Sequence, residues 1–266
     1  FLLVFFPCFL ILQQPDAGSA LVYGALIIPF FREGFPIKYI FFLSMLILLF
    51  LLTIIVGVNF TMMILVTLCM MLAYFLKKNK KTIFPALIIF IFSALTINIV
   101  NYAYEDVLRP HQKERIDIII GKEKNTLGSG YNLNQSLIAI GSGGGIGKGY
   151  LNGTQTKFNF VPEQNTDFIF CTIGEEFGFL GSLILIFLFI SFIGRLILLS
   201  EKQSSRFSRI IGYSTASIIF AHTVINISMT IGMMPVIGIP LPFFSYGGSS
   251  LLAFSILLFI FLRLDS

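Results

Sequence analysis

One carboxylate in this sequence lies where a polar segment meets a long apolar segment. Asp167 follows Glu163, Gln164 and Thr166, and it directly precedes the hydrophobic residues 168–171. A carboxylate at the start of a helix can cap that helix by accepting hydrogen bonds from its first backbone N–H groups. It can also take a proton from a reacting hydroxyl group as a general base. The two roles are compatible, so both interpretations of Asp167 stay open on these residues alone.

Polar and basic side chains are frequent in the region that precedes Asp167. A carboxylate near cations, at the border of an apolar segment, is what an enzyme needs to bind an anionic lipid head group and to remove a proton from an acceptor. The side chains that could contribute are Gln155, Lys157, Lys148, Arg109 and Arg115.

The composition is that of a membrane protein. Hydrophobic residues make up 56% of the 266 residues and charged residues only 12%, whereas soluble domains average about 45–50% and 25%. The net charge of +5 is no sign of nucleic-acid binding, because the basic residues lie at the ends of apolar segments. Cys8, Cys69 and Cys171 are far apart and form no CxxC motif, so we expect neither a zinc site nor a disulfide framework.

The apolar segments predict an all-α, polytopic bundle of spanning helices in a single transmembrane domain over 1–266. A span needs about 20 apolar residues, and the segments that qualify are 37–58, 59–76, 82–102, 167–199, 210–232 and 249–264. Segment 1–12 is too short and starts without Met, so we expect the natural N-terminus and further spans to precede it. Segment 19–31 is also apolar. Segment 167–199 is longer than the hydrocarbon core, so we expect it to tilt or to project.

The polar region 103–165 predicts one large loop, with a short interfacial helix at 136–140. Segment 235–248 holds three prolines and cannot be regular helix. Basic residues in short loops mark the cytoplasmic side of a membrane, and here they fall on one side of the predicted spans. These residues are Arg32, Lys38, Lys202, Arg206, Arg209, Arg263 and the lysines of 77–81. The large loop and Asp167 are therefore expected outside the cytoplasm.

The glycine-rich segment 141–149 does not fit a nucleotide-binding motif. Ser142 stands where a phosphate-binding loop requires its first glycine, and Gly149 stands where that loop requires Ser or Thr. Two interpretations remain. The glycines can serve a loop with positive φ angles and close backbone approach, or their amides can line a cradle for phosphate or sugar, with Lys148 beside it.

Several polar residues within or beside the apolar segments have structural interpretations. Asp16 suits the N-cap of the helix that follows it. His222 and Asn226 share one helical face and are expected to form hydrogen bonds between helices. Glu175 and Glu176 lie inside the long apolar segment, where an acid can be structural or functional. Small residues that favour close helix packing recur nearby at Gly174, Gly178 and Gly181.

Four ordered blocks carry a specific resemblance to a known family. They are QPDAGSA (14–20), RPHQKERI (109–116), GYNLNQSLIAIGSGGGIGKGYLNGTQTKFNFVPEQNTDFIFCTIGEEFGFLG (130–181) and NISMTIGMMPVIGIPLPFFSYGGSS (226–250). Together they resemble the RodA branch of the SEDS family, the shape, elongation, division and sporulation proteins. The resemblance covers most of the chain except about 32–98. The pair of segments within 37–76, joined by a short turn, is therefore expected to be additional to the family pattern.

The resemblance implies a peptidoglycan glycosyltransferase in the bacterial cytoplasmic membrane. Such proteins polymerise lipid II, an undecaprenyl-pyrophosphate disaccharide-pentapeptide, for cell elongation and shape, together with a class B penicillin-binding protein that crosslinks the glycan. The aspartate of the TDFIF block is essential in the family, and here it is Asp167, the expected general base. The substrate-binding candidates are Glu163, Gln164, Thr166, Lys157, Gln155, Lys148, Arg109, Arg115, Gln112 and Ser249.

The chemistry of the leaving group asks for positive charge at the site. A departing pyrophosphate needs no general acid, but it needs compensating charge, from the basic candidates with or without a divalent cation. No other cofactor is expected. Two alternatives to the enzyme are a lipid II flippase, which needs polar groups deep in the spans, and a scaffold for the crosslinking enzyme without activity of its own.

Overall fold

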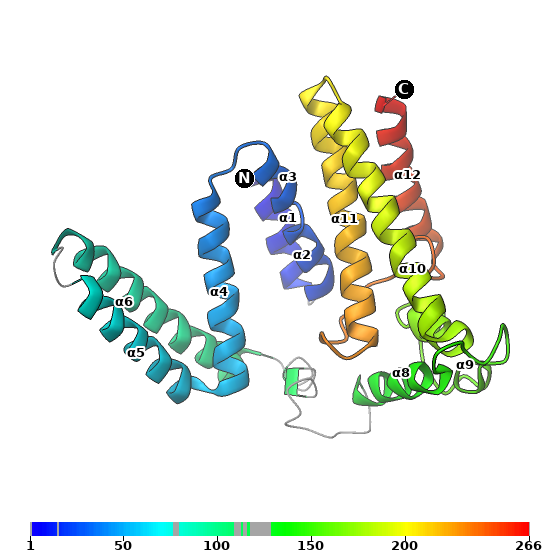
Figure 1. Ribbon diagram of the computed structural model, residues 1–266, viewed down its shortest axis with the longest axis horizontal. Coiled ribbons are helices and arrows are strands. Elements are labelled where there is room, and N and C mark those ends of the chain that lie inside the picture. Colours follow the sequence, from blue (N-terminus) through cyan, green and yellow to red (C-terminus); the bar gives the residue numbers. More distant parts are fainter. Residues whose placement is uncertain are drawn as a thin grey trace. The chain divides into compact units, whose positions relative to one another are not determined.

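The computed structural model describes residues 2–14, 16–76, 80–108, 113, 116–117 and 129–265. The regular elements among these residues are helices, and no strand occurs in the described part of the chain (Figure 1). The chain divides into two compact units, one of residues 35–120 and one of residues 1–34 and 121–266. Whether they act as the single domain expected over 1–266 stays a prediction.

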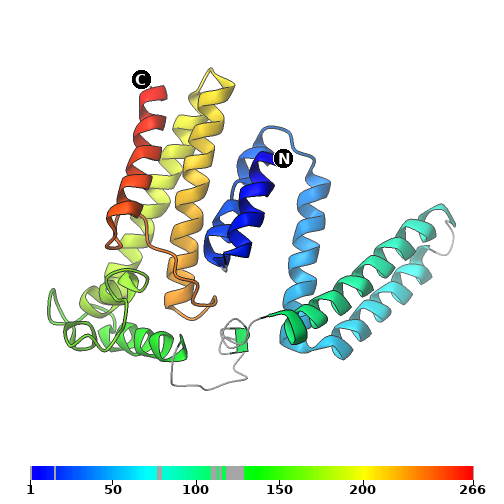
Figure 2. The same ribbon diagram turned by 180° about the vertical axis from the view of Figure 1, so that it is seen from behind.

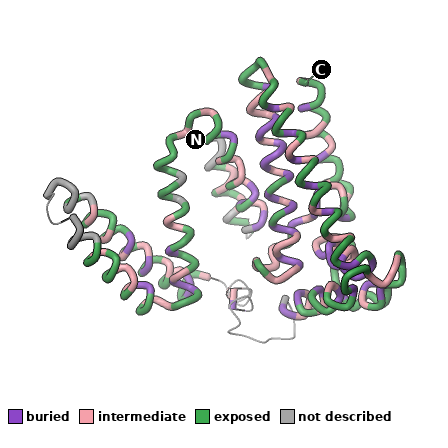
Figure 3. The backbone as a smooth tube through the Cα atoms, viewed as in Figure 1, coloured by how far each residue is buried: buried purple, intermediate pink, exposed green. Residues whose placement is uncertain are grey.

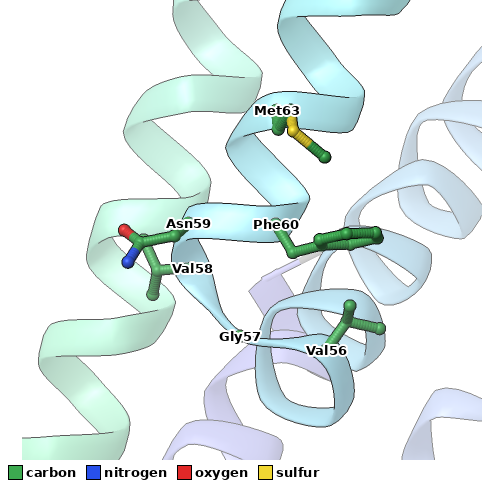
Figure 4. A pocket seen from close by; sticks show the side chains of 6 residues that line it. All are labelled: Val56, Gly57, Val58, Asn59, Phe60 and Met63. Atoms are coloured by element: carbon green, nitrogen blue, oxygen red, sulfur yellow. The ribbon is translucent and has the colours of Figure 1, made fainter.

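The smaller unit is built from three long helices. These are α4 (Ile37–Val56), α5 (Val58–Leu76) and α6 (Lys80–Tyr102), which continues into the short π-helix η1 (Ala103–Val107). Gly57 alone separates α4 from α5, which confirms the short turn expected between these helices. A surface pocket of about 380 Å³ lies at this turn (Figure 4). None of the expected site residues lines this pocket. Its lining consists of Val56, Gly57, Val58, Asn59, Phe60 and Met63.

The larger unit holds the remaining helices. Near the start of the chain are α1 (Leu2–Gln13), α2 (Ala17–Gly24) and α3 (Ile27–Arg32). The polar region contributes α8 (Ser129–Gly143) and α9 (Thr154–Lys157). The long helices are α10 (Ile169–Lys202), α11 (Arg206–Thr230) and α12 (Gly248–Asp265). The short helix predicted at 136–140 is thus part of the longer α8.

The core of the larger unit lies between α10, α11 and α12. Leu196, Ile219 and Phe261 are almost completely buried there, and buried residues follow one another along α11 (Figure 3). Gly212 of α11 permits this packing, because a Cβ atom at that position would lie 2.1 Å from the Ser200 hydroxyl. The close approach of these helices is therefore determined by a residue without a side chain.

Five helices in the described part of the chain are long and apolar enough to cross a membrane. They are Ile37–Val56, Ala86–Val107, Ile169–Lys202, Arg206–Thr230 and Gly248–Asp265. Two shorter apolar helices, Gly18–Arg32 and Val58–Met71, accompany them. This pattern confirms the predicted all-α, polytopic membrane fold.

The helix α10 does not run unbroken over its 34 residues. Gly178 has φ 64° and ψ −159°, which interrupts the helix. Residues 179–202 then form a helix of roughly 36 Å at 1.5 Å per residue, close to the thickness that a tilted span crosses. The sequence predicted a tilted or projecting helix, whereas the structure shows a break that separates residues 169–177 from the span.

Ion pairs join the ends of three helices in the larger unit. Arg32 donates two hydrogen bonds to Glu201, at 3.1 and 2.8 Å. Glu33 accepts from Arg206 at 2.6 Å and from Arg209 at 2.8 Å, and these bonds lower the pKa of Glu33 to about 2. Three of the basic residues predicted to share one side of the membrane, Arg32, Arg206 and Arg209, thus lie at one end of α10. Asp167 lies beyond its other end.

The N-cap predicted at Asp16 is confirmed. The backbone N–H of Ser19 donates to Asp16 Oδ1 at 3.0 Å, and the Ser19 hydroxyl together with this backbone N–H lowers the pKa of Asp16. The following turn of α2 packs against the proline-rich segment, because a Cβ atom at Gly18 would lie 2.9 Å from the carbonyl oxygen of Ile237.

Candidate active site

Asp167 lies on a tight turn directly before α10. The turn is closed by two backbone hydrogen bonds of 3.1 Å, from the N–H groups of Thr166 and Phe168 to the carbonyl of Glu163. Glu163 has φ 56°, and its carboxylate accepts from the Thr166 hydroxyl at 2.9 Å. The N-cap position of α10 is Phe168, and no side chain caps the helix. The capping interpretation of Asp167 is therefore wrong, and its carboxylate is available for chemistry.

The carboxylate of Asp167 is half-buried and accepts no hydrogen bond from the described residues. Burial raises the pKa of Asp167, and the nearby negative charge of Glu163 raises it further. Gly238 lies beside the carboxylate, since a Cβ atom at that glycine would be 3.2 Å from Asp167 Oδ2. An unpaired carboxylate with a raised pKa is a stronger base than a solvated one.

Three consecutive backbone carbonyls hold the turn from the other side. Asn165 accepts from the backbone N–H of Tyr246 at 2.7 Å, Thr166 accepts from the Ser245 hydroxyl at 2.6 Å, and Asp167 accepts from the Asn226 amide at 2.8 Å. We call these three hydrogen bonds the carbonyl clamp. They tie the residues before α10 to α11 and to the segment that precedes α12.

The proline-rich segment 235–248 returns along α11 to the start of α12 (Figure 2). Asn226 donates a second hydrogen bond to Ile239 O at 2.7 Å, and His222 Nδ1 lies 3.2 Å from Pro240 O. The sequence predicted bonds between helices for this pair, but their partners are carbonyls outside regular helix. A segment without helical hydrogen bonds leaves its carbonyls unpaired, and two polar side chains of α11 satisfy them.

The glycine-rich segment fills the break in α10. An unbroken helix would bond the N–H groups of Phe179 and Leu180 to the carbonyls of Glu175 and Glu176, four residues earlier. Instead, these N–H groups donate to the carbonyls of residues 144 and 145, at 2.9 and 3.1 Å. The carbonyls of Glu175 and Glu176 accept from the N–H groups of residues 148 and 149, at 3.0 and 2.9 Å. The amides at 148 and 149 are thus used by α10, which favours the structural interpretation of the glycines.

Close backbone approach explains why glycines occur at this contact. A Cβ atom at Gly178 would lie 2.4 Å from the backbone nitrogen of Gly147, and one at Gly147 would lie 2.2 Å from Glu176 O. Gly174 packs against α8, where a Cβ atom would lie 2.9 Å from Ile140. Gly174 therefore serves the close helix packing that the sequence predicted, whereas Gly178 forms the break and packs against the glycine-rich segment, and Gly181 lies against Phe177 of its own helix.

Glu175 has a structural environment. Its side chain is fully buried and pairs with Lys148 Nζ at 2.7 Å. It also accepts from the backbone N–H groups of Gln155 and Thr156 and from the Thr156 hydroxyl, each at 2.9 Å. Glu175 thereby fastens α9 and the glycine-rich segment to α10.

The other predicted site residues have varied environments. Lys157 is exposed on α9, and Ser249 is exposed at the start of α12. Gln164 donates to Asn159 Oδ1 at 2.6 Å. Lys148 is engaged with Glu175, and its role toward a substrate stays a prediction. Arg109, Gln112 and Arg115 lie outside the described residues.

Sequence reasoning missed the hydrogen bond from Asn226 to the Asp167 carbonyl, the hydrogen bond from Ser245 to the Thr166 carbonyl, and the position of Gly238 beside the Asp167 carboxylate. The sequence signal for these contacts was that two polar residues, His222 and Asn226, share a face of the helix directly before a segment with three prolines. Within the described part of the chain, no group of three or more His, Cys, Asp or Glu side chains could hold a metal ion.

The helices and the half-buried carboxylate define a polytopic membrane protein with a polar site beside one of its spans. Comparison with known sequences then places the chain: it belongs to the FtsW/RodA/SpoVE family of cell cycle proteins, whose profile matches residues 35–266. The match includes 37–76, and whether that pair is additional to the family pattern stays a prediction.

Two curated relatives illustrate the similarity. The peptidoglycan glycosyltransferase RodA of Treponema pallidum is 32% identical over 268 residues, covering 92% of this chain and 62% of the relative. The peptidoglycan glycosyltransferase MrdB of Escherichia coli K12 is 42% identical over 146 residues, covering 55% of this chain and 40% of the relative. The chain thus spans 40% to 62% of the length of these two relatives.

A solved structure has a similar fold. It is described as "Structural coordination of polymerization and crosslinking by a peptidoglycan synthase complex", and the TM-score is 0.62 at 24% sequence identity. The similarity covers 99% of this chain and 59% of the solved chain. At this identity the likeness concerns the fold.

Proposed function

We propose that this chain carries the catalytic base of a peptidoglycan glycosyltransferase that polymerises lipid II, and that Asp167 is this base. The observation that carries the proposal is a half-buried carboxylate without a hydrogen-bond partner among the described residues, held by its backbone and raised in pKa. Two curated relatives are named peptidoglycan glycosyltransferases. The environment of Asp167 fits the base that such a reaction requires.

The reaction is a displacement at the anomeric carbon of the donor. The 4-hydroxyl of the acceptor N-acetylglucosamine attacks the anomeric carbon of the donor N-acetylmuramic acid. A new glycosidic bond forms, the bond to undecaprenyl pyrophosphate breaks, and the hydroxyl proton moves to Asp167. General base catalysis of this kind is worth about 10²- to 10⁴-fold in rate. A single displacement with one carboxylate predicts inversion at the anomeric carbon.

The pyrophosphate needs positive charge as it leaves. Lys157 is exposed, and it forms no ion pair among the described residues. Lys148 already pairs with Glu175, so Lys157 is the better candidate of the two. Arg109 and Arg115 complete the proposed set, with or without a divalent cation. Both substrates have lipid tails, and confinement in one membrane plane supplies part of their orientation.

The proposed location is the outer face of the bacterial cytoplasmic membrane. The ion-paired basic residues at the far end of α10 mark the cytoplasmic side by the distribution of Lys and Arg. Asp167 then faces the side on which glycan is built. A class B penicillin-binding protein is the proposed partner, since its crosslinking reaction consumes the new glycan strands.

The decisive experiment replaces Asp167 with asparagine. The full chain is reconstituted in liposomes with a class B penicillin-binding protein and purified lipid II, and glycan length is followed on gels. We expect Asp167→Asn to lower polymerisation at least 100-fold, in line with the loss of a general base. The control is Asp16→Asn, which makes the same change at a helix cap that asparagine also satisfies. Undiminished polymerisation by Asp167→Asn would refute the assignment, and a flippase or a scaffold would become the better hypothesis.

A further inference from the structure

We propose that Asn226 and Ser245 are positioning residues for Asp167, which hold its backbone so that the carboxylate stands beside Gly238. The inference rests on the proposed role of Asp167 as the base. Asn226 and Ser245 lie 59 and 79 residues from the groups that they bind. They make no contact with substrate in this proposal and act only through the carbonyl clamp.

The turn is closed by its own hydrogen bonds to Glu163, and the clamp joins it to α11 and to the segment before α12. The Asp167 side chain has no hydrogen bond among the described residues, and α10 begins without a side-chain cap. The position of the carboxylate therefore depends on the backbone of residues 165–167. Each of these residues uses its carbonyl in a hydrogen bond of 2.6 to 2.8 Å to Tyr246, Ser245 or Asn226.

The chemistry of Asn226 fits this role. The side chain is completely buried, and its amide gives one hydrogen to Asp167 O and the other to Ile239 O. Its own oxygen Oδ1 is buried and has no hydrogen-bond partner among the residues that the structure describes. The two hydrogen bonds that the amide donates together determine the orientation of Asn226, and among neutral side chains of this size only an amide has two such donor hydrogens. The bond to Ile239 O holds the proline-rich segment, and the bond to Asp167 O holds the backbone of the proposed base.

Ser245 links the clamp to the same segment. Its hydroxyl donates to Thr166 O at 2.6 Å and accepts from the Leu241 N–H at 2.7 Å. The serine thus joins the tight turn at 241–245 to the peptide bond that precedes Asp167. Since Gly238 borders the Asp167 carboxylate, this segment supplies both the support for the base and the surface next to it.

Precise placement of a base has a measurable effect on rate. A displacement of about 1 Å can lower the rate roughly 100-fold, because the reacting atoms leave the geometry in which transfer occurs. We expect Ser245→Ala and Asn226→Ala to lower kcat by about 10- to 100-fold and to change KM for lipid II less than about threefold. Ser245→Thr keeps the hydroxyl and should recover most of the activity. Because a smaller folded fraction would also lower the apparent kcat at unchanged KM, each rate is divided by the folded fraction of its variant.

Matched controls come from residues with the same chemistry and no contact to residues 165–167. Asn98→Ala removes an amide whose hydrogen bond among the described residues goes to Ala94 O within its own helix. Ser217→Ala removes a buried hydroxyl that, within the same described residues, bonds Tyr213 O of α11. Both variants should keep their activity. Thermal unfolding of each purified variant in detergent identifies any that fails to fold, and the Ser245→Ala and Ser245→Thr pair decides the question if Asn226→Ala is one of them.

The double variant Asp167→Asn with Ser245→Ala separates the two proposals. If Ser245 acts through Asp167, the serine change should add less than about threefold to the loss caused by Asp167→Asn, since residues that act as one unit are not additive. An inactive Asp167→Asn beside a fully active, folded Ser245→Ala overturns the positioning role alone. An active Asp167→Asn overturns the proposed base and the clamp with it. An equal loss for Ser245→Ala and Ser245→Thr, or a loss entirely in KM, also overturns the positioning role.

Discussion

Replacement of Glu175 with glutamine tests how the break in α10 is held. Glu175 Oε1 accepts from the Gln155 N–H at 2.9 Å, and Oε2 accepts from the Thr156 N–H and hydroxyl at 2.9 Å. Glutamine has nearly the same shape, but one of its two terminal atoms is a donor. Whichever way the new amide turns, a backbone N–H of α9 faces another donor.

The expected cost follows from these contacts. A buried donor that loses its acceptor costs about 1–3 kcal/mol. The ion pair with Lys148 is left out of this figure, because glutamine can still accept a hydrogen bond from the lysine, whose side chain is 26% exposed and can also reach water. We therefore expect the local opening of α9 to become easier by about 2 kcal/mol, which is roughly a 30-fold change in the opening equilibrium.

Amide hydrogen exchange measures this opening directly. In the purified chain in detergent, protection at the amides of Gln155 and Thr156 should fall roughly 30-fold in Glu175→Gln, while the core amides of α11 keep theirs. The control is Glu163→Gln, because Glu163 is exposed and accepts from a hydroxyl that glutamine can also satisfy. Unchanged protection in Glu175→Gln would refute the reasoning. It would mean that the backbone bonds at residues 144–149 hold the break without the carboxylate.

Two further predictions concern the surroundings of Asp167. Gly238→Ala should lower the polymerisation rate at least 10-fold, because a Cβ atom there would lie 3.2 Å from Asp167 Oδ2. The control is Gly232→Ala, since Gly232 has a similar positive φ but a Cβ atom there would have its nearest neighbour at 3.6 Å. Equal losses of activity in both variants would indicate that backbone strain alone causes the effect. The acidic limb of the pH–rate profile should lie above the pKa of an ordinary aspartate, because burial and Glu163 both raise the pKa of Asp167. Asp167 acts only when deprotonated, so Glu163→Gln should move this limb to lower pH, and a limb that stays in place or rises would contradict the proposal.

The long helices and the start of α10 could be predicted from the sequence because they depend on local patterns. Apolar length predicted the long helices, and the change from polar to apolar residues at Asp167 marked the start of α10. Asp16 was predicted as a cap from its immediate neighbours, and the hydrogen bond to Ser19 confirms it. Such features need only the residues within one or two helical turns.

The break at Gly178 and the carbonyl clamp could not be predicted in the same way. Periodicity extends through Gly178, and the glycine alone costs a helix only about 1 kcal/mol. The break forms because the glycine-rich segment, some thirty residues earlier, offers two carbonyls and two N–H groups. Asn226 likewise looked like a residue that bonds another helix. Its partners depend on where a segment without helical structure returns along α11, which no local pattern specifies.

The break and the clamp together explain how a polar site can lie beside a span. Backbone groups freed within a membrane protein must be paired by the protein itself, and the four groups freed at the break are paired by residues 144–149. This pairing allows residues 169–177 to have a helix axis different from that of residues 179–202. The clamp then fixes the turn before them with carbonyl bonds, which leaves the Asp167 carboxylate unpaired. A base needs this combination, since a hydrogen bond to the carboxylate would hold it equally well but would lower its pKa and its strength as a base.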